Sequence, residues 1–443
     1  MGERRALIIF GLLHAVIFLG LFTSLGRQFY YGPGEFERWV SLHMLQGQVP
    51  YRDFLTEYPP LALLSFLLPG LFFRTPMAYS WAFSTEMLLL DLVGLTLVAA
   101  SASRLGVSSW GSLGIYTVTL LSVGPIAISR YDLLPAVLVL AALHAFIAGR
   151  NKLAWAILAL GVAAKGYPAI IAPLLALCCL RHRGYRRLME GVVAFAAVLL
   201  IVVLPCVLLS AQGFWQFLSF HAQRGLHSES SYASVLLIGQ ILGLTQLEAG
   251  FSFGSWNLSS PLADTLARVS PYIAVGLLLA VYSLYTKSLW RAARPKEGMV
   301  SLSPEESRLV VNHSLLAVLA FLLTSKLFSP QFLVWLCPLL PLIGGRWRHL
   351  SWWLFVAVGG LTQYLFPYHY IEFELGCPHL IGILAGRNLL LVVMALLLTN
   401  LTRPVHHDRM QRQPGEDYEP VATRGRRGHR GNQDIGRGGQ RRR

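Results

Sequence analysis

The feature of this sequence that most constrains its fold is a succession of long apolar runs. The first run covers residues 6–25 and follows a short basic start. Further runs lie at about 77–103, 108–126, 133–148, 152–164, 168–180, 189–210, 270–287, 309–325, 331–344, 351–366 and 379–402. An apolar run of about 20 residues forms a helix long enough to cross a bilayer. The pattern therefore predicts an all-α, polytopic membrane protein. We interpret residues 6–25 as its first spanning helix, because the run is long for a signal peptide.

Composition supports this interpretation. Hydrophobic residues make up 54% of the chain and charged residues 13%, which is about half the charged share of soluble domains. So few charged residues could not cover the surface of a soluble fold, which excludes a cytosolic enzyme, a disordered protein and a disulfide-rich secreted domain. The five cysteines lack metal-binding spacing, and we interpret them as small buried apolar residues.

The basic residues predict the topology. The net charge is +15, and Lys and Arg accumulate on the cytoplasmic side of membrane proteins. Every basic cluster can be cytoplasmic, together with the N-terminus, if residues 61–73 do not cross the membrane. A helix of that length covers about 20 Å, which is too short for a hydrocarbon core of about 30 Å. We therefore expect about twelve spanning helices and a first outer loop that carries short juxtamembrane helices.

Two further segments have their own interpretation. The runs 152–164 and 168–180 are short, and we expect a tight hairpin with its tip at 165–168 on the outer side or sunk toward the membrane. Residues 1–402 would form the membrane domain. Residues 403–443 are rich in Arg and Gly and poor in apolar residues, so we expect a disordered cytoplasmic tail. Such tails can bind RNA, but we favour contact with anionic lipid and expect no nucleic-acid partner.

With this topology, the distinctive polar residues come from separate outer segments. They are Glu35, Glu37, Asp53, Glu57, Tyr58, Arg130, Asp132, Lys165, His221, Arg224, Glu229, Gln331 and His369. Charged residues from separate loops that meet at membrane depth suggest a binding site.

Three of the cations suit a phosphate ligand. Arg130 and Arg224 can bind phosphate through paired hydrogen bonds, and Lys165 can bind it as a point charge. A carboxylate of the first loop could act as a general base. The alternative is structural: each cation could be an interfacial residue, and Arg130 could simply pair with Asp132. Lys165 lies between two apolar helices, where a positive charge is costly unless an anion meets it.

Two carboxylates, Glu86 and Asp91, lie inside the run 77–103. Because they are five residues apart, they do not share a helical face. Buried carboxylates can form proton relays in transporters, or they can be hydrogen-bonded packing groups. They leave a non-enzymatic transporter or flippase for lipid-linked sugars as an alternative function.

Several motifs resemble those of glycosyltransferase family 87. Tyr-Arg-Asp-Phe at 51–54 and Glu-Tyr-Pro-Pro-Leu at 57–61 are similar to the family's first-loop signature. Four more stretches agree in the same order, at 130–135, 165–168, 221–230 and 329–338. The family comprises polytopic glycosyltransferases of the C superfamily, including α-mannosyltransferases that use polyprenyl-phosphate-mannose. The resemblance implies a helical fold with the 61–73 helix at the membrane surface, and inverting transfer without a nucleotide-binding loop.

The chain departs from the superfamily at the catalytic acid. The superfamily places an Asp early in the first outer loop, whereas no Asp occurs here before Asp53. Glu35 and Glu37 occupy this region. In a short helix from about 35 to 46 they would point about 200° apart, so only one can face a cavity. We favour Glu35 as the base because Trp39 follows it four residues later, as in the family pattern, and Glu37 remains the other candidate.

The resemblance and the residues together predict a glycosyltransferase of the plasma membrane. It would transfer a hexose, with mannose expected, from a polyprenyl-phosphate donor to a lipid, glycan or protein acceptor on the outer face. Arg130, Lys165 and Arg224 would bind the donor phosphate. The remaining site residues, Asp53, Glu57, Tyr58, Asp132, His221, Glu229, Gln331 and His369, would bind substrate. We expect no cofactor and no metal. A family member that binds glycolipid without turnover is a further alternative.

Overall fold

The computed structural model describes residues 2–25, 34–182, 184–292 and 301–401. The expected tail at 403–443 lies outside these residues. Within the described part, six helices are long and apolar enough to cross a membrane, so the chain is an integral membrane protein. They are α1 (Gly2–Leu25), α4 (Pro76–Leu105), α10 (Gly184–Leu209), α13 (Pro261–Arg291), α14 (Pro304–Thr324) and α17 (Pro378–Leu401).

Shorter apolar helices complete the bundle. They are α5 (Ser109–Val123), α7 (Leu133–Ile147), α8 (Asn151–Ala164), the 3₁₀ helix η1 (Tyr167–Ile171), α9 (Ala172–His182) and α15 (Arg348–Gln363). The chain reverses its direction between α8 and α9, as the expected hairpin requires, because Asn151 at the start of α8 accepts a hydrogen bond from Cys179 near the end of α9. The helix α14 is largely buried. The expected total of about twelve spanning helices stays a prediction.

One predicted spanning helix is wrong. The run 331–344 forms two short 3₁₀ helices, η2 (Pro330–Trp335) and η3 (Leu340–Leu342), instead of one continuous helix. Pro338 and Pro341 lie inside the run, and proline has no N–H to donate and its ring clashes with the preceding turn. The segment is buried within the protein, where the surrounding structure can tolerate irregular backbone.

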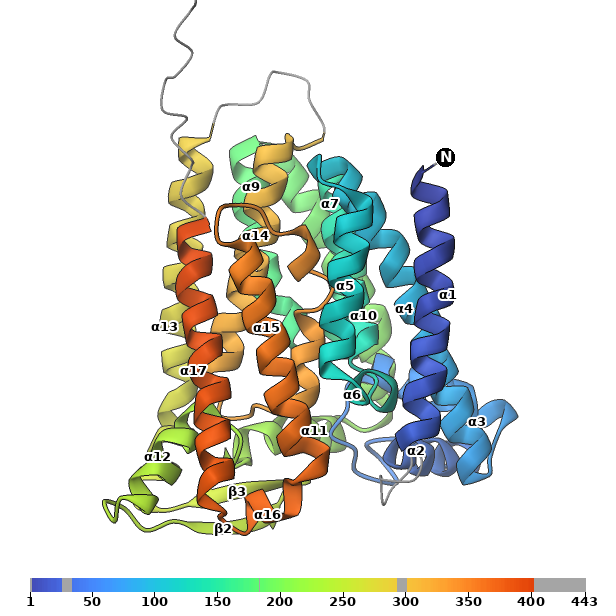
Figure 1. Ribbon diagram of the computed structural model, residues 1–443. Helices are drawn as coiled ribbons and strands as arrows, with labels where there is room; N and C mark the ends of the chain where they lie inside the picture. The colour runs from blue at the N-terminus through green and yellow to red at the C-terminus, as the bar shows by residue number, and fades with distance from the viewer. Residues whose placement is uncertain (1, 26–33, 183, 293–300, 402–443) are drawn as a thin grey trace, which may run out of the picture. The chain divides into compact units, whose positions relative to one another are not determined.

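The short elements gather at one end of the helical bundle, opposite the start of α1 (Figure 1). They are α2 (Glu35–Leu45), α3 (Pro60–Phe72), α6 (Ile126–Ser129), α11 (Ala211–Gln223), α12 (Ser231–Ile241), the π-helical turn η4 (Tyr364–Tyr368) and α16 (Tyr370–Glu374). The helix α3 lies beside α2 at this end (Figure 1). Its 13 residues agree with the prediction that this run is too short to span.

This end also carries a small antiparallel sheet, which was not expected from the sequence. Its strands are β1 (Leu226–His227), β2 (Glu248–Ser252) and β3 (Ser255–Ser259), in the order β1-β3-β2. Leu226 pairs with Leu258 and His227 with Asn257. The described residues are otherwise helical or irregular, which confirms the all-α class apart from this sheet.

Candidate active site

A cavity of about 720 Å³ opens among the loops of the α2, α6, α11 and α16 segments and the tip of the α8–α9 hairpin. Eight of the residues predicted for the site line it. They are Glu57, Tyr58, Arg130, Lys165, His221, Arg224, Glu229 and Gln331. The volume lies within the range of small-molecule sites. Among these eight residues, Glu57 and Gln331 are the farthest apart in the sequence (331 − 57 = 274), and the fold brings them to the same cavity.

Lys165 has the anionic partner that its position requires. Its Nζ lies 2.6 Å from Oδ1 of Asp132, and the indole Nε1 of Trp335 donates to the same oxygen at 2.6 Å. Asp132 is buried, whereas the Lys165 side chain is 17% exposed and lines the cavity. The carboxylate thus holds the ammonium at the cavity wall, where Lys165 still has two protons to donate.

This pairing leaves Arg130 available. The structure contradicts a local ion pair between Arg130 and Asp132, because Asp132 binds Lys165 instead. Arg130 lines the cavity, and within the described residues it forms no ion pair. A guanidinium without a carboxylate at the wall of a partly enclosed cavity is suited to an anionic ligand.

Arg224 and Glu57 form a second charged pair at the wall. Arg224 Nη1 lies 3.3 Å from Glu57 Oε2, and its Nη2 donates to the carbonyl of Phe253 at 2.6 Å. His221 Nε2 donates to the carbonyl of Glu57 at 2.9 Å, so its Nδ1 is the acceptor nitrogen. Burial lowers the pKa of His221. The first loop and α11 are therefore tied together by hydrogen bonds at the cavity.

Aromatic rings form much of the remaining wall. Tyr167 and Trp335 stack with ring centroids 3.9 Å apart, and Lys165 Nζ lies 4.7 Å from the ring centroid of Tyr131. The hydroxyl oxygens of Tyr131 and Tyr167 are buried without a hydrogen-bond partner in the described residues. These surfaces combine apolar faces with free polar groups, as cavities for organic ligands do.

The two candidate bases of α2 lie in opposite environments. Glu35 is exposed, so the expectation that it faces inward is wrong. Glu37 is fully buried, and neither of its carboxylate oxygens has a partner in the described residues. Burial raises the pKa of Glu37, while the positive charge of Arg130 opposes that increase. The first turn of α2 carries a glycine at its N-cap (Gly34) and places Phe36 at the cavity wall. Neither glutamate itself is among the lining residues.

Two other predicted residues lie away from the cavity. Asp53 accepts hydrogen bonds from the Arg52 guanidinium and from the backbone N–H of Val49, and the bond from Arg52 lowers the pKa of Asp53 to about 2. His369 Nδ1 donates to the carbonyl of Tyr364 at 2.9 Å. Both side chains stabilise turns of the loops, and neither belongs to the cavity wall.

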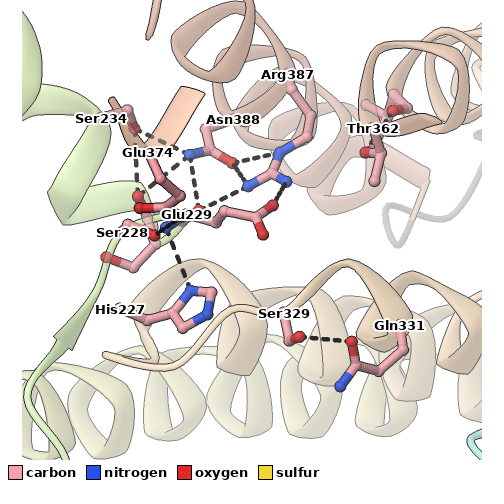
Figure 2. A network of polar contacts seen from close by, with 12 residues as sticks. His227, Ser228, Glu229, Ser234, Ser329, Gln331, Thr362, Glu374, Arg387 and Asn388 are labelled. Carbon is pink, nitrogen blue, oxygen red and sulfur yellow. Dashed lines mark hydrogen bonds and ion pairs between the residues drawn. The ribbon is translucent and has the colours of Figure 1, made fainter. Parts of the chain in front are cut away.

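One charged residue beside the cavity is not among those predicted from the sequence. Arg387 lies in α17 and is fully buried, and its Nη1 contacts Glu229 Oε2 at 2.9 Å. Asn388 follows it and donates to the Ser234 hydroxyl at 2.9 Å (Figure 2). The available signal was an arginine inside the apolar run 379–402, because ionisable residues within spanning segments usually have a partner and a role.

The intramembrane carboxylates have packing partners. Asp91 Oδ2 lies 2.6 Å from His14 Nδ1, and Asp91 Oδ1 accepts from the Tyr116 hydroxyl at 2.8 Å. Glu86 accepts from the Ser65 hydroxyl at 2.6 Å. Neither carboxylate lines the cavity. In the described part of the chain, no cluster of three or more His, Cys, Asp or Glu side chains could hold a metal ion.

No family model and no curated protein matches the sequence. Two solved structures are similar to this chain at 13% identity. ArnT from Cupriavidus metallidurans in the apo state has a TM-score of 0.41, over 91% of this chain and 78% of that chain. The oligosaccharyltransferase of Archaeoglobus fulgidus with a tethered acceptor peptide has a TM-score of 0.38, over 89% of this chain and 55% of that chain. These likenesses are distant.

Proposed function

We propose that this protein is a membrane glycosyltransferase that transfers a hexose, with mannose as the expected sugar, from polyprenyl phosphate to an acceptor on the outer face of the membrane. The fold would be of the C-superfamily type, as the resemblance of the loop motifs implies. The observation that carries the proposal is Arg130, which lines the cavity without a carboxylate partner among the described residues. The other two cations of the wall are already paired.

The donor phosphate fits beside Arg130. Lys165 and Arg224 line the same cavity, and their carboxylate partners hold them in place. A lipid-linked phosphodiester carries one negative charge, which Arg130 can balance. During transfer this phosphate becomes the leaving group, and hydrogen bonds from fixed cations stabilise the charge that develops on it.

Glu37 is the carboxylate that we propose as the general base. Glu37 follows the wall residue Phe36 and is not itself in the wall, so the acceptor would have to enter beside Phe36. Glu37 would then accept the proton of the acceptor hydroxyl, whose oxygen attacks the anomeric carbon while the bond from that carbon to the phosphate oxygen breaks. Inversion at the anomeric carbon follows from this single displacement. The role is supported by a carboxylate that has no other partner in the described residues and by burial, which raises the pKa of Glu37 above its usual value and so makes it a stronger base.

The rival function, transport without transfer, has less support. It depended on Glu86 and Asp91 as a proton relay. Both oxygens of Asp91 are bonded, to His14 and Tyr116, which is the pattern of a satisfied packing group. Glu86 accepts from Ser65 through Oε1, and its Oε2 is buried without a partner in the described residues, but Glu86 has no carboxylate or histidine partner there that would continue a relay.

A direct assay tests the proposal. Purified protein is incubated with a panel of polyprenyl-phosphate sugars and candidate acceptors, and release of the lipid phosphate is followed. We expect release from at least one hexose donor, and loss of that release in the Glu37→Gln variant. Movement of the donor across vesicles with no cleavage of the glycosidic bond would support the transporter instead.

A further inference from the structure

A second polar cluster borders the cavity on the side of α17, where Glu229 and Arg387 form a buried ion pair. Arg387 donates to the Glu229 carboxylate at 2.9 Å and to the Glu229 backbone carbonyl at 2.6 Å. The side chain of Asn388 accepts from the Arg387 Nε at 3.1 Å. Both charged side chains are buried and have lost their hydration. The additional hydrogen bonds compensate for this loss and hold the pair in one geometry.

This arrangement uses only one of the two carboxylate oxygens of Glu229. Oε2 contacts Arg387, whereas Oε1 is buried and has no hydrogen-bond partner in the described residues. In Figure 2 the second oxygen points away from Arg387, and Glu229 lines the cavity. Leaving a buried ionised oxygen without a donor is costly, so a bound ligand that supplies a donor would be favoured there.

The charges on the cavity wall limit which chemical group can donate a hydrogen bond to Glu229 Oε1. The cavity wall already carries Arg130, Lys165 and Arg224, and these charges disfavour an ammonium group. A second anion would be repelled by the negative charge of the Glu229 carboxylate. A neutral hydroxyl can donate one hydrogen bond to Oε1 without adding charge. The ring of Tyr370 and the side chains of Ser329 and Gln331 also line the cavity, so a small polyhydroxylated ring would find both flat and polar surfaces.

We infer that Glu229, held in position by Arg387, binds a ring hydroxyl of the transferred hexose and contributes to the choice of sugar. The inference rests on the proposed function, and it assigns Glu229 a sugar-binding role and Arg387 a positioning role. Arg387 fixes the direction of the carboxylate, and the Oε1 of Glu229 accepts a charge-assisted hydrogen bond from the sugar hydroxyl. A sugar without that hydroxyl would leave Oε1 buried and unpaired.

The experiment uses the full chain, polyprenyl-phosphate-mannose and its monodeoxy analogues. For each donor both binding and kcat/KM for transfer are measured. We expect the wild-type protein to lose about 100-fold or more in kcat/KM with one monodeoxy donor, because sites built to bind a hydroxyl reject analogues that lack it. In Glu229→Gln, Arg387 takes the amide oxygen and the NH₂ group faces the cavity. We expect kcat/KM for the parent donor to fall about 10- to 100-fold, and kcat/KM for that deoxy donor to change less than about threefold.

Two further variants keep the test decisive. Glu374→Gln is the matched control, since Glu374 accepts from Ser228 at 2.8 Å in the same network and does not line the cavity, and it should keep the discrimination. If Glu229→Gln does not fold, Glu229→Met with Arg387→Met removes both charges together, which proteins often tolerate, and should lose the discrimination.

Failure of this inference and failure of the proposed function give different results. Equal losses for all donors in Glu229→Gln, or a wild-type protein that does not discriminate between the donors, would overturn the sugar-binding role while transfer stands. If the wild-type protein transfers from no donor, the proposed function fails, and binding of the parent and deoxy donors still decides the role of Glu229. No binding of any donor overturns both.

Discussion

At the scale of single residues, α2 carries two carboxylates that differ in burial. Glu37 is buried with both oxygens unpartnered in the described residues, and Glu35 is exposed two positions earlier. Glu37→Gln keeps the shape of the side chain and removes the base, so we expect turnover to fall by about 10²- to 10⁴-fold with donor binding retained. Glu35→Gln is the control and should change turnover little. The opposite result would return the role of base to Glu35.

The pH dependence of turnover should follow Glu37. A base works in its deprotonated form, and burial raises the pKa of Glu37 above the usual 4.5. Turnover should therefore rise as the pH increases through a value above 4.5. Arg130 opposes the increase in pKa, so Arg130→Ala should move this rising limb to higher pH. A pH–rate profile of kcat/KM measures both effects, and a limb that stays in place in Arg130→Ala would contradict the coupling.

Substituting Arg130 should mainly affect donor binding, whereas substituting Lys165 should also lower the stability of the protein. Arg130→Ala removes an unpaired cation and should weaken donor binding by about 1.5–3 kcal/mol, the range for a hydrogen bond to a charged group, with little change in Tm. Lys165→Ala leaves the buried Asp132 carboxylate without its cation, and we expect a loss of about 3–5 kcal/mol in the free energy of unfolding. Donor titration and thermal denaturation in detergent distinguish the two variants. If Arg130→Ala lost as much stability as Lys165→Ala, Arg130 would have a structural role instead of a role in donor binding.

At the scale of elements, a close approach between α11 and the first loop holds the site together. Gly213 lies near the start of α11, and a Cβ atom there would collide with the backbone carbonyl of Tyr51. Because backbone cannot move aside as a flexible side chain can, Gly213→Ala should displace α11, which carries His221.

We expect Gly213→Ala to lower both Tm and kcat/KM. Gly276→Ala in α13 is the matched control, because a Cβ there meets nothing within 4 Å, and alanine is the better helix former. Denaturation and turnover are measured for both variants. Wild-type behaviour of Gly213→Ala would show that the loop and α11 can separate without affecting the site.

At the scale of the whole molecule, the proposed topology places the cavity end of the bundle outside. Ser103 donates to Glu3 at 3.0 Å, which puts the end of α4 beside the start of α1. In a background without native cysteines, single cysteines at Arg52 and Phe73 should react with an impermeant reagent from outside, and one at Arg104 only after permeabilisation. Reaction of the first two positions from opposite sides would mean that α3 crosses the membrane.

The sequence by itself indicated where most of the apolar helices lie, and it identified eight of the residues that line the cavity. Apolar runs specify helix positions because burial in lipid depends on local composition and length. The run 331–344 was assigned to a continuous helix because its hydropathy was given more weight than the prolines at 338 and 341. The polar residues Arg130, Lys165 and Arg224 were identifiable because charges are rare in such a chain, and the cavity collects all three.

Only the tertiary structure decided which charges pair and which side chains face inward. Asp132 is two residues from Arg130, yet it binds Lys165, which is 33 residues away. Glu229 is paired with Arg387, 158 residues away, and Glu37 rather than Glu35 is buried. Partner choice depends on distances in space that helix packing sets, whereas periodicity and composition describe only neighbours along the chain. A two-residue spacing in α2 specifies that its glutamates face different ways, but the elements packed against α2 determine which of them is buried.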